Sequence, residues 1–197
     1  MTNDYADYVA ELANLHCRMV FATAYRVLGN TDDAEDVLQE VFLKMLRSWT
    51  GRLKPVADWG AYLRVMASRC AVDLLRRKPR WAEDGAKPLE DFPAPADQNP
   101  RHAAIQRQRA MLLRRALQSL RKRDARIFAL RYFEDLSYDE IARQTGLSTQ
   151  SVGVILHRAR KRLREILEPI LGESRLMPDS PQVVNPTGRL AAGREGE

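Results

Sequence analysis

Basic side chains recur at helical spacing near the end of the chain, and together they could bind a polyanion. The apolar residues of this segment form a helical stripe, and the basic and polar residues lie largely off it. The stripe consists of Val152, Ile155, Leu156, Ala159, Leu163, Ile166 and Leu167, and the other side carries Gln150, Ser151, His157, Arg158, Arg160, Lys161, Arg162 and Arg164. This pattern predicts a helix that packs through one face and presents positive charge on the other.

A second helix is predicted immediately before the basic one. Ser137 is followed three residues later by Glu140, so the hydroxyl and the carboxylate can each accept a hydrogen bond from a backbone N–H at a helix start. This capping box predicts a helix that begins near Tyr138.

The residues between the two helices are typical of a helix-turn-helix. Ala142 is small where two helices would cross, Gly146 tolerates a positive φ in the turn, and Val152 is a branched plug between the helices. The second helix is expected to begin at Ser148. A basic face alone would favour a solvated helical hairpin, but these residues at these offsets favour binding to DNA.

No group of residues has the spacing of a catalytic site. The sequence lacks a nucleophile with its base, a glycine-rich phosphate loop and paired carboxylates on a rigid frame. Cys17 and Cys70 are far apart and neither belongs to a Cys-x-x-Cys motif, so a zinc site or a disulfide is poorly supported. We expect a protein that is not an enzyme and that needs no metal ion or other cofactor.

The positive charge is concentrated in the second half of the chain. Residues 101–171 contain 16 Lys and Arg against 7 Asp and Glu, whereas residues 1–77 contain 10 of each. Binding of this half to a polyanion should be steeply salt-dependent because counterions are released. No apolar run is long enough to span a bilayer and the N-terminus does not have the pattern of a signal peptide, so we expect a cytoplasmic protein without membrane insertion.

Three amphipathic helices are predicted in the first 78 residues. The first covers residues 5–28 and ends at Gly29-Asn30, because both residues tolerate the left-handed conformation. The second carries apolar residues at helical spacing from Ala34 to Trp49, with acidic residues near its N-terminal dipole. A loop over residues 50–58 leads to the third, which closes before Pro79.

A change in composition separates these helices from the basic half. Residues 79–103 contain five prolines with several acidic residues, which predicts a flexible acidic linker. Further helical segments around residues 105–120 and 127–133 lead into the helix-turn-helix, and residues 172–197 have the composition of a disordered tail. The predicted fold is all-α, with two small helical domains over residues 5–78 and 104–171.

This layout resembles the extracytoplasmic-function (ECF) subfamily of bacterial RNA polymerase sigma-70-type sigma factors. Residues 25–46 resemble the segment of region 2 that docks on the polymerase clamp, and residues 62–77 resemble its promoter-melting helix. Residues 126–142 and 156–163 resemble region 4. The resemblance extends over about residues 8–168 and rests on three separated motifs in the right order.

The resemblance implies a factor that binds the clamp and flap of core RNA polymerase, recognises the −10 and −35 promoter elements and helps to melt the DNA. It implies three sets of contacts. The clamp would contact Asp33, Asp36, Gln39 and Glu40; the −10 element would contact the loop over residues 50–58 together with Arg64, Ser68, Arg69, Arg76 and Arg77; and the −35 element would contact Thr149, Gln150, Val154, His157, Arg158 and Lys161. An anti-sigma factor is a further partner that the resemblance leaves open.

Several positions keep other interpretations open. Many family members have Asn where this chain has Arg69, and Lys-Ser where it has Gly153-Val154. The acidic residues of the second helix could simply offset its dipole, and Trp49 and Trp59 fit core positions better than base-stacking platforms. The alternative functions are a helix-turn-helix regulator that binds duplex DNA without polymerase, and an interaction protein that does not read DNA.

Overall fold

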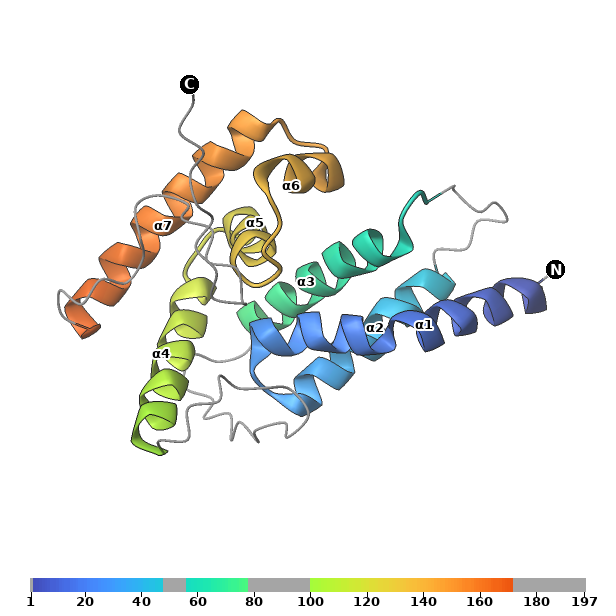
Figure 1. Ribbon diagram of the computed structural model, residues 1–197, viewed down its shortest axis with the longest axis horizontal. Helices are drawn as coiled ribbons and strands as arrows, with labels where there is room; N and C mark the ends of the chain where they lie inside the picture. Colours follow the sequence, from blue (N-terminus) through green and yellow to red (C-terminus); the bar gives the residue numbers. More distant parts are fainter. Residues whose placement is uncertain (1, 48–55, 78–99, 172–197) are drawn as a thin grey trace, which may run out of the picture.

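The structure is a computed structural model that describes residues 2–47, 56–77 and 100–171. These residues form seven α-helices and no strand, which confirms the predicted all-α class. The helices are α1 (Thr2–Leu28), α2 (Thr31–Arg47), α3 (Trp59–Arg77), α4 (Pro100–Gln118), α5 (Lys122–Tyr132), α6 (Tyr138–Thr145) and α7 (Thr149–Leu171). Helices α1, α2 and α3 lie alongside one another and form the first helical group. Helices α4 to α7 form the second helical group, which packs on α3 (Figure 1).

The helix boundaries agree with the sequence prediction to within a few residues except at two helix starts: α5 begins at Lys122, before the predicted residue 127, and α4 begins inside the predicted linker. Helix α4 begins at Pro100, so residues 100–103 are helical. A proline is favourable at a first helical position because its missing N–H needs no partner there. The other predicted linker residues, the predicted tail, Trp49 and residues 50–55 lie outside the described residues.

The first three helices bury a common apolar core. Val20, Val41 and Leu63 are fully buried, one from each helix. Trp59 packs edge-on against Tyr8 and Tyr62, with ring centroids 5.9 and 5.7 Å apart. This partly buried position agrees with a packing role for Trp59.

The helix-turn-helix is supported by α5. Ile127 and Leu130 of α5 are buried with Ile141 of α6 and Leu156 of α7. Helix α5 therefore forms a platform that fixes α6 and α7 relative to each other.

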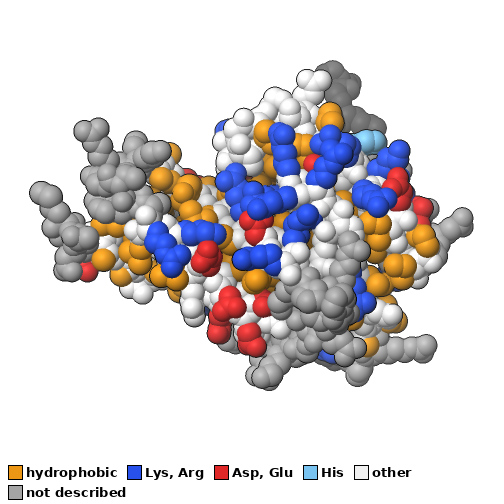
Figure 2. Space-filling model, turned by 180° about the vertical axis from the view of Figure 1, so that it is seen from behind, with side chains coloured by type: hydrophobic (Ala, Val, Ile, Leu, Met, Phe, Trp, Pro, Cys, Tyr) orange, Lys and Arg blue, Asp and Glu red, His pale blue; other side chains and the backbone are white. Residues whose placement is uncertain are grey.

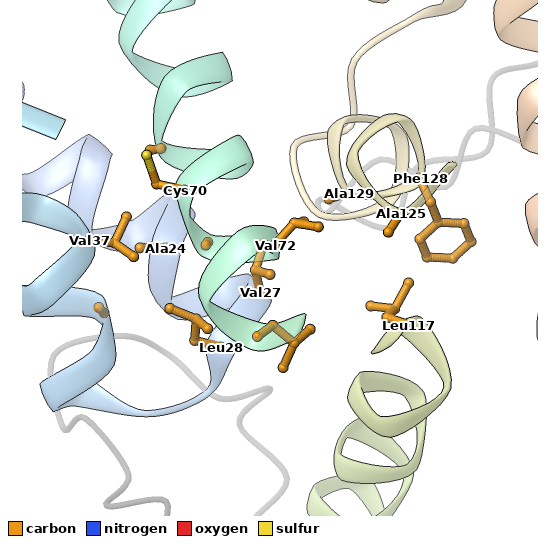
Figure 3. Packing of buried hydrophobic residues seen from close by; sticks show 14 of the residues in the cluster. Ala24, Val27, Leu28, Val37, Cys70, Val72, Leu117, Ala125, Phe128 and Ala129 are labelled. Carbon is orange, nitrogen blue, oxygen red and sulfur yellow. The ribbon is translucent and has the colours of Figure 1, made fainter. Parts of the chain in front are cut away.

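The apolar cores of the two helical groups are continuous (Figure 3). Val72 of α3 lies beside Ala129 of α5, and Phe128 lies in the same buried cluster. Val65 of α3 is buried with Ile127 and Leu130. The two groups are therefore packed directly against each other, which the sequence did not predict.

None of the described helices combines the length and the apolarity that a bilayer-crossing helix requires.

Candidate nucleic-acid interface

Helices α6 and α7 form the predicted helix-turn-helix. The Ser137 hydroxyl accepts a hydrogen bond from the Glu140 N–H, and the Glu140 carboxylate accepts one from the Ser137 N–H at 2.7 Å, which confirms the capping box. Gly146 ends α6 with a φ of 72°, and Val152 is fully buried between the helices together with Ala142. All the residues of the predicted signature therefore have the expected roles.

The start of α7 is fixed by two side-chain hydrogen bonds. The Ser148 hydroxyl accepts from the Ser151 N–H at 3.1 Å, so Ser148 caps the helix and the helix itself begins one residue later. The Thr149 hydroxyl donates to the Asp139 carboxylate at 2.8 Å. Because Asp139 lies in the first turn of α6, this bond ties the beginnings of the two helices together.

Five of the six residues predicted to contact the −35 element share one exposed face of α7, and Thr149 lies at the helix start. We call the residues of this face the α7 face: Gln150, Val154, His157, Arg158 and Lys161. Arg158 also lies 3.3 Å from a carboxylate oxygen of Asp124 in α5. Lys and Arg side chains gather over much of the molecular surface seen in Figure 2, with fewer acidic groups among them.

The two glycines of the helix-turn-helix should respond oppositely to replacement by alanine. Gly146 has a positive φ and open space around it, so Gly146→Ala should lower the free energy of unfolding by about 1–2 kcal/mol through backbone strain alone. Gly153 is helical, and an added Cβ would be in ordinary contact with Tyr138 at 3.7 Å. Gly153→Ala should therefore raise the free energy of unfolding by up to about 1 kcal/mol. Urea denaturation followed by circular dichroism measures both changes. If the two variants changed the free energy of unfolding in the same direction, this explanation would be contradicted.

The capping box should make stability depend on pH. Hydrogen bonds from the Ser137 side chain and backbone lower the pKa of Glu140 below its ordinary 4.5. A lowered folded-state pKa means that this contribution is complete above the unfolded pKa and is lost as the pH falls through the folded pKa. Urea denaturation at pH 7 and pH 3 should therefore show a smaller acid loss for Glu140→Gln than for the wild type. Equal losses would contradict the assignment.

The four arginines predicted to contact the −10 element divide into two pairs on α3. Arg69 and Arg77 are exposed. Arg64 lies 3.7 Å from the Glu134 carboxylate, and the Arg76 guanidinium donates to the backbone carbonyls of Leu120 and, at 3.0 Å, Gln118. Arg64 and Arg76 are therefore engaged with the second helical group.

Ser68 requires a correction. Its side chain is fully buried, and its hydroxyl has no hydrogen-bond partner among the described residues. Burial between packed helices leaves it no access to DNA in this arrangement, so the predicted direct contact does not fit the structure.

The residues predicted to contact the clamp lie on α2, with one exception. Asp36 and Gln39 are exposed and Glu40 is partly exposed, whereas Asp33 is only 8% exposed. Asp33 lies in the first helical turn, where its N–H donates to the Asn30 side chain at 3.0 Å, so it does not belong to the exposed surface that was predicted.

The exposed acidic residues of α2 adjoin an apolar side chain and a shallow hollow. We call Asp36, Gln39, Glu40 and Leu43 the α2 face. It lines one side of a hollow of about 690 Å³, whose lining also includes the basic residues Lys44, Arg76, Arg77 and Lys122. Lys44 donates to Glu40 at 3.0 Å, and this hydrogen bond lowers the pKa of the Glu40 carboxyl. An exposed apolar residue beside fixed negative charge is suited to a protein partner with a basic surface.

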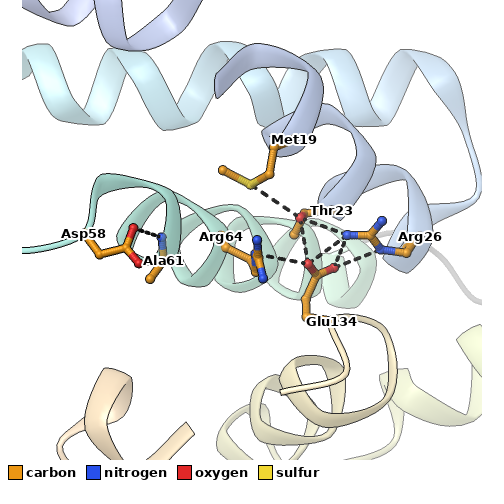
Figure 4. A network of polar contacts seen from close by, with 7 residues as sticks. All are labelled: Met19, Thr23, Arg26, Asp58, Ala61, Arg64 and Glu134. Atoms are coloured by element: carbon orange, nitrogen blue, oxygen red, sulfur yellow. Dashed lines mark hydrogen bonds and ion pairs between the residues drawn. The ribbon is translucent and has the colours of Figure 1, made fainter. Parts of the chain in front are cut away.

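A cluster of polar contacts that the sequence did not indicate joins the two helical groups (Figure 4). Glu134, after α5, accepts hydrogen bonds from Thr23 and Arg26 of α1 and faces Arg64 of α3. These residues are separated by as many as 111 positions in the chain. No local spacing could have indicated that they meet.

The cysteines do not form a reactive or metal-binding site with the described residues around them. Cys70 is buried, and burial raises the pKa of its thiol although the Lys44 ammonium lies 3.4 Å from the sulfur. Within residues 2–47, 56–77 and 100–171, no three His, Cys, Asp or Glu side chains are grouped as a metal ion would require.

Comparison with known proteins identifies both halves of the chain. Residues 12–80 match the family described as Sigma-70 region 2, and residues 110–163 match the one described as Sigma-70, region 4. The chain is similar to the ECF RNA polymerase sigma factor SigE of Mycolicibacterium smegmatis, with 31% identity over 157 residues that cover 80% of this chain and 60% of that protein. It is also similar to the RNA polymerase sigma factor CarQ of Myxococcus xanthus, with 30% identity over 161 residues that cover 82% of this chain and 90% of that protein.

A solved structure supports the fold. The structure of CnrH in complex with the cytosolic domain of CnrY has a TM-score of 0.51 and 20% identity, and covers 86% of this chain and 93% of that one. The match to region 2 precedes the match to region 4 in the chain, and the helix-turn-helix lies within the match to region 4. The chain therefore belongs to the ECF subfamily of sigma-70-type sigma factors, non-enzymatic proteins that bind core RNA polymerase and act in transcription initiation.

Proposed function

We propose that this sigma factor reads the −35 element through the α7 face, contacts the opened −10 element through α3 and the loop before it, and docks on the polymerase clamp through the α2 face. In this proposal residues 5–78 and 104–171 are the two functional domains, residues 79–103 connect them and residues 172–197 form a tail. The observation that carries the proposal is the α7 face, an exposed row of polar and basic residues on the second helix of a helix-turn-helix.

The α7 face has the side chains that duplex recognition requires. Gln150 can pair with the edge of an adenine, and Arg158 and Lys161 can bind guanine or phosphate. Thr149 is the weaker candidate because its hydroxyl is already bonded to Asp139. Arg158 would have to exchange its contact with Asp124, whose side chain is only 9% exposed, for a contact with DNA.

A small hollow at the start of α3 supports contact with unpaired bases. It has a volume of about 250 Å³ and is lined by Val56, Asp58, Tyr62 and Arg69, among other residues. Tyr62 is 45% exposed, so a base can stack on its ring, and Arg69 can neutralise a nearby phosphate. Arg77 adds positive charge at the far end of the helix.

The α2 face is the proposed clamp contact, reduced to Asp36, Gln39 and Glu40 after the correction at Asp33. The polymerase flap is the proposed partner of the second domain, and an anti-sigma factor is a further candidate partner. The proposed site of action is the cytoplasm, where the polymerase and the promoters are found.

Transcription in vitro tests the proposal directly. Sigma-free core polymerase is incubated with a library of promoter fragments, with and without the protein. Discrete transcripts that require both components support the proposal, and their start sites define the −10 and −35 sequences. Binding to duplex DNA without any transcript would favour a polymerase-independent regulator, and binding to polymerase without transcripts would favour an interaction protein.

Val154 should contribute to reading thymine in the −35 element. It is the only apolar residue of the α7 face and is 54% exposed, and an apolar side chain recognises the C5-methyl group of thymine. Replacing the contacted thymine by deoxyuridine removes this methyl group, worth about 0.8 kcal/mol, and should weaken binding about four-fold. Binding to end-labelled promoter fragments, measured with the polymerase holoenzyme, checks this.

The matched control for Val154 is the variant Val154→Ala. It should distinguish the thymine and deoxyuridine fragments less than the wild type does, because the shorter side chain makes less apolar contact with the methyl group. If no single deoxyuridine substitution in the −35 element distinguishes the wild type from Val154→Ala, Val154 does not read thymine.

A further inference from the structure

The contact between the two helical groups contains a buried ionic cluster. The Glu134 side chain is only 1% exposed. The Arg26 guanidinium donates to both of its carboxylate oxygens at 2.8 Å, and the Thr23 hydroxyl donates to one of them at 2.9 Å (Figure 4). Arg64 adds a second positive charge at 3.7 Å. A buried carboxylate needs this many partners because it has lost its hydration.

A second ionic contact lies further along α3. Asp73 receives a hydrogen bond from Arg126 of α5 at 2.6 Å and faces Lys122 at 3.0 Å. Burial is the largest single influence on the pKa of the Asp73 carboxyl and raises it, but the hydrogen bonds and charges of Arg126 and Lys122 together outweigh burial and lower this pKa. Asp73 is therefore ionised at neutral pH, and the contact persists there.

Backbone hydrogen bonds and apolar contacts complete the surface. The Gln118 amide donates to the Leu75 carbonyl at 2.7 Å, and the Arg114 guanidinium donates to the Val27 carbonyl at 3.1 Å. Both carbonyls lie in the last turns of their helices, where they have no partner within the helix. Together with the shared apolar core, these contacts connect α1 and α3 to α4, α5 and the turn after α5.

This packed arrangement is incompatible with simultaneous contact to both promoter elements. The −10 and −35 elements are about 25 base pairs apart, roughly 85 Å at 3.4 Å per base pair. Helix α3 contacts α5 and α6 directly, and α7 packs on both of these helices. The chain between Arg77 and Pro100 is long enough to allow separation, because an extended residue spans about 3.5 Å.

The contact also covers part of the surface proposed for the −10 element. Arg64 is paired with Glu134, and the Arg76 guanidinium donates hydrogen bonds to the backbone carbonyls of Gln118 and Leu120. Glu134 is therefore paired with Arg64, a side chain that a DNA phosphate would need as its own partner. DNA and Glu134 must compete for Arg64.

We propose that Glu134 locks the two domains together in the free protein through Arg26, Thr23 and Arg64, and that assembly with core polymerase must open this lock. The proposal rests on the function proposed above, because α3 must be free to receive the −10 element. When the lock opens, water can replace the contacts among Glu134, Arg26 and Arg64, and this hydration offsets part of their loss. The closed and open forms are therefore two alternative states of the free protein. The apparent affinity for polymerase is then the affinity of the open form multiplied by the fraction of molecules that are open.

Single-molecule fluorescence transfer on the full chain tests the lock. The dyes are attached at Glu11→Cys in α1 and Glu165→Cys in α7, both exposed, in a Cys17→Ser, Cys70→Ala background. The wild type should be mostly compact. Glu134→Gln should raise the ratio of open to closed molecules at least ten-fold, and the affinity for sigma-free core polymerase should rise by the factor by which the open fraction increases.

The matched control is Asp135→Asn. Asp135 is the next residue, its side chain is 70% exposed, and asparagine tolerates its positive φ of 50°. This variant should behave like the wild type. Arg26→Met removes the other half of the lock, so it should reproduce the effect of Glu134→Gln, and the double variant should open no further than either single one.

The proposal is overturned if the free wild type is already extended, if Glu134→Gln stays as compact as Asp135→Asn, or if opening leaves the affinity for polymerase unchanged. Circular dichroism of each variant distinguishes opening from unfolding, and Arg26→Met provides the decisive comparison if Glu134→Gln unfolds. Failure of the proposed function gives a different result, namely that the wild type with core polymerase produces no transcripts.

Discussion

Reversing the charge of two residues on the α2 face, Asp36→Lys with Glu40→Lys, is expected to weaken binding to core polymerase at least about 30-fold. Replacing one partner of a close interfacial charge pair costs about 2–5 kcal/mol, and each 1.4 kcal/mol corresponds to a factor of ten. The fold should survive, because Asp36 is exposed and Glu40 makes only a partly exposed pair with Lys44. Binding is measured by fluorescence anisotropy of the labelled protein with sigma-free core polymerase.

The control for this double variant places the same change of charge elsewhere. Glu11 of α1 and Glu168 of α7 are exposed and lie outside the α2 face, so Glu11→Lys with Glu168→Lys should bind polymerase nearly as the wild type does. Equal losses in the two double variants would mean that net charge matters and that the α2 face does not dock on the clamp.

Truncation of Phe128 is expected to have the largest effect on stability. Its ring is fully buried, stacks on Tyr132 with centroids 4.4 Å apart and meets Phe133 edge-on at 6.5 Å. Phe128→Ala should lower the free energy of unfolding by about 3–5 kcal/mol, because the cavity adds to the lost burial. This is a large part of the 5–15 kcal/mol by which most domains are stable.

Urea denaturation of Phe128→Ala, followed by tryptophan fluorescence and by the helical circular dichroism signal, tests this prediction. All three tryptophans precede residue 82, whereas Phe128 is in the second half of the chain. Because the buried cluster is continuous, the tryptophan transition should shift together with the helical signal. The control Tyr132→Ala removes a ring that is 41% exposed and should cost less. A tryptophan transition unaffected by Phe128→Ala would mean that the two halves unfold independently.

The individual helices could be predicted because the signals that specify them are local. The period of apolar residues in α2 and α7 requires only that one side of a helix be buried. The capping box at Ser137 and the positive φ of Gly146 act within four residues, so their types indicate where α6 begins and ends. The same locality made the α7 face predictable as a set.

Ser68 and Asp33 show that burial depends on what packs against a helix. The resemblance to sigma factors implied a DNA contact for Ser68 and a clamp contact for Asp33, and both contacts need an exposed side chain. Their positions on helices that pack against others leave both buried. A polar residue type does not by itself establish exposure, since the neighbouring helix determines which side is covered.

By itself, the sequence determined the all-α class, the helix-turn-helix, the basic face of α7 and the resemblance to ECF sigma factors, because each depends on residues within a few turns of one another. Only the tertiary structure decided that Glu134 meets Thr23, Arg26 and Arg64, and that Asp73 meets Arg126. These charges lie far apart in the chain, and each has other possible partners of opposite sign. Their pairing became defined only when the apolar faces of α3 and α5 packed together, which brought these charges close to one another and buried the Glu134 carboxylate.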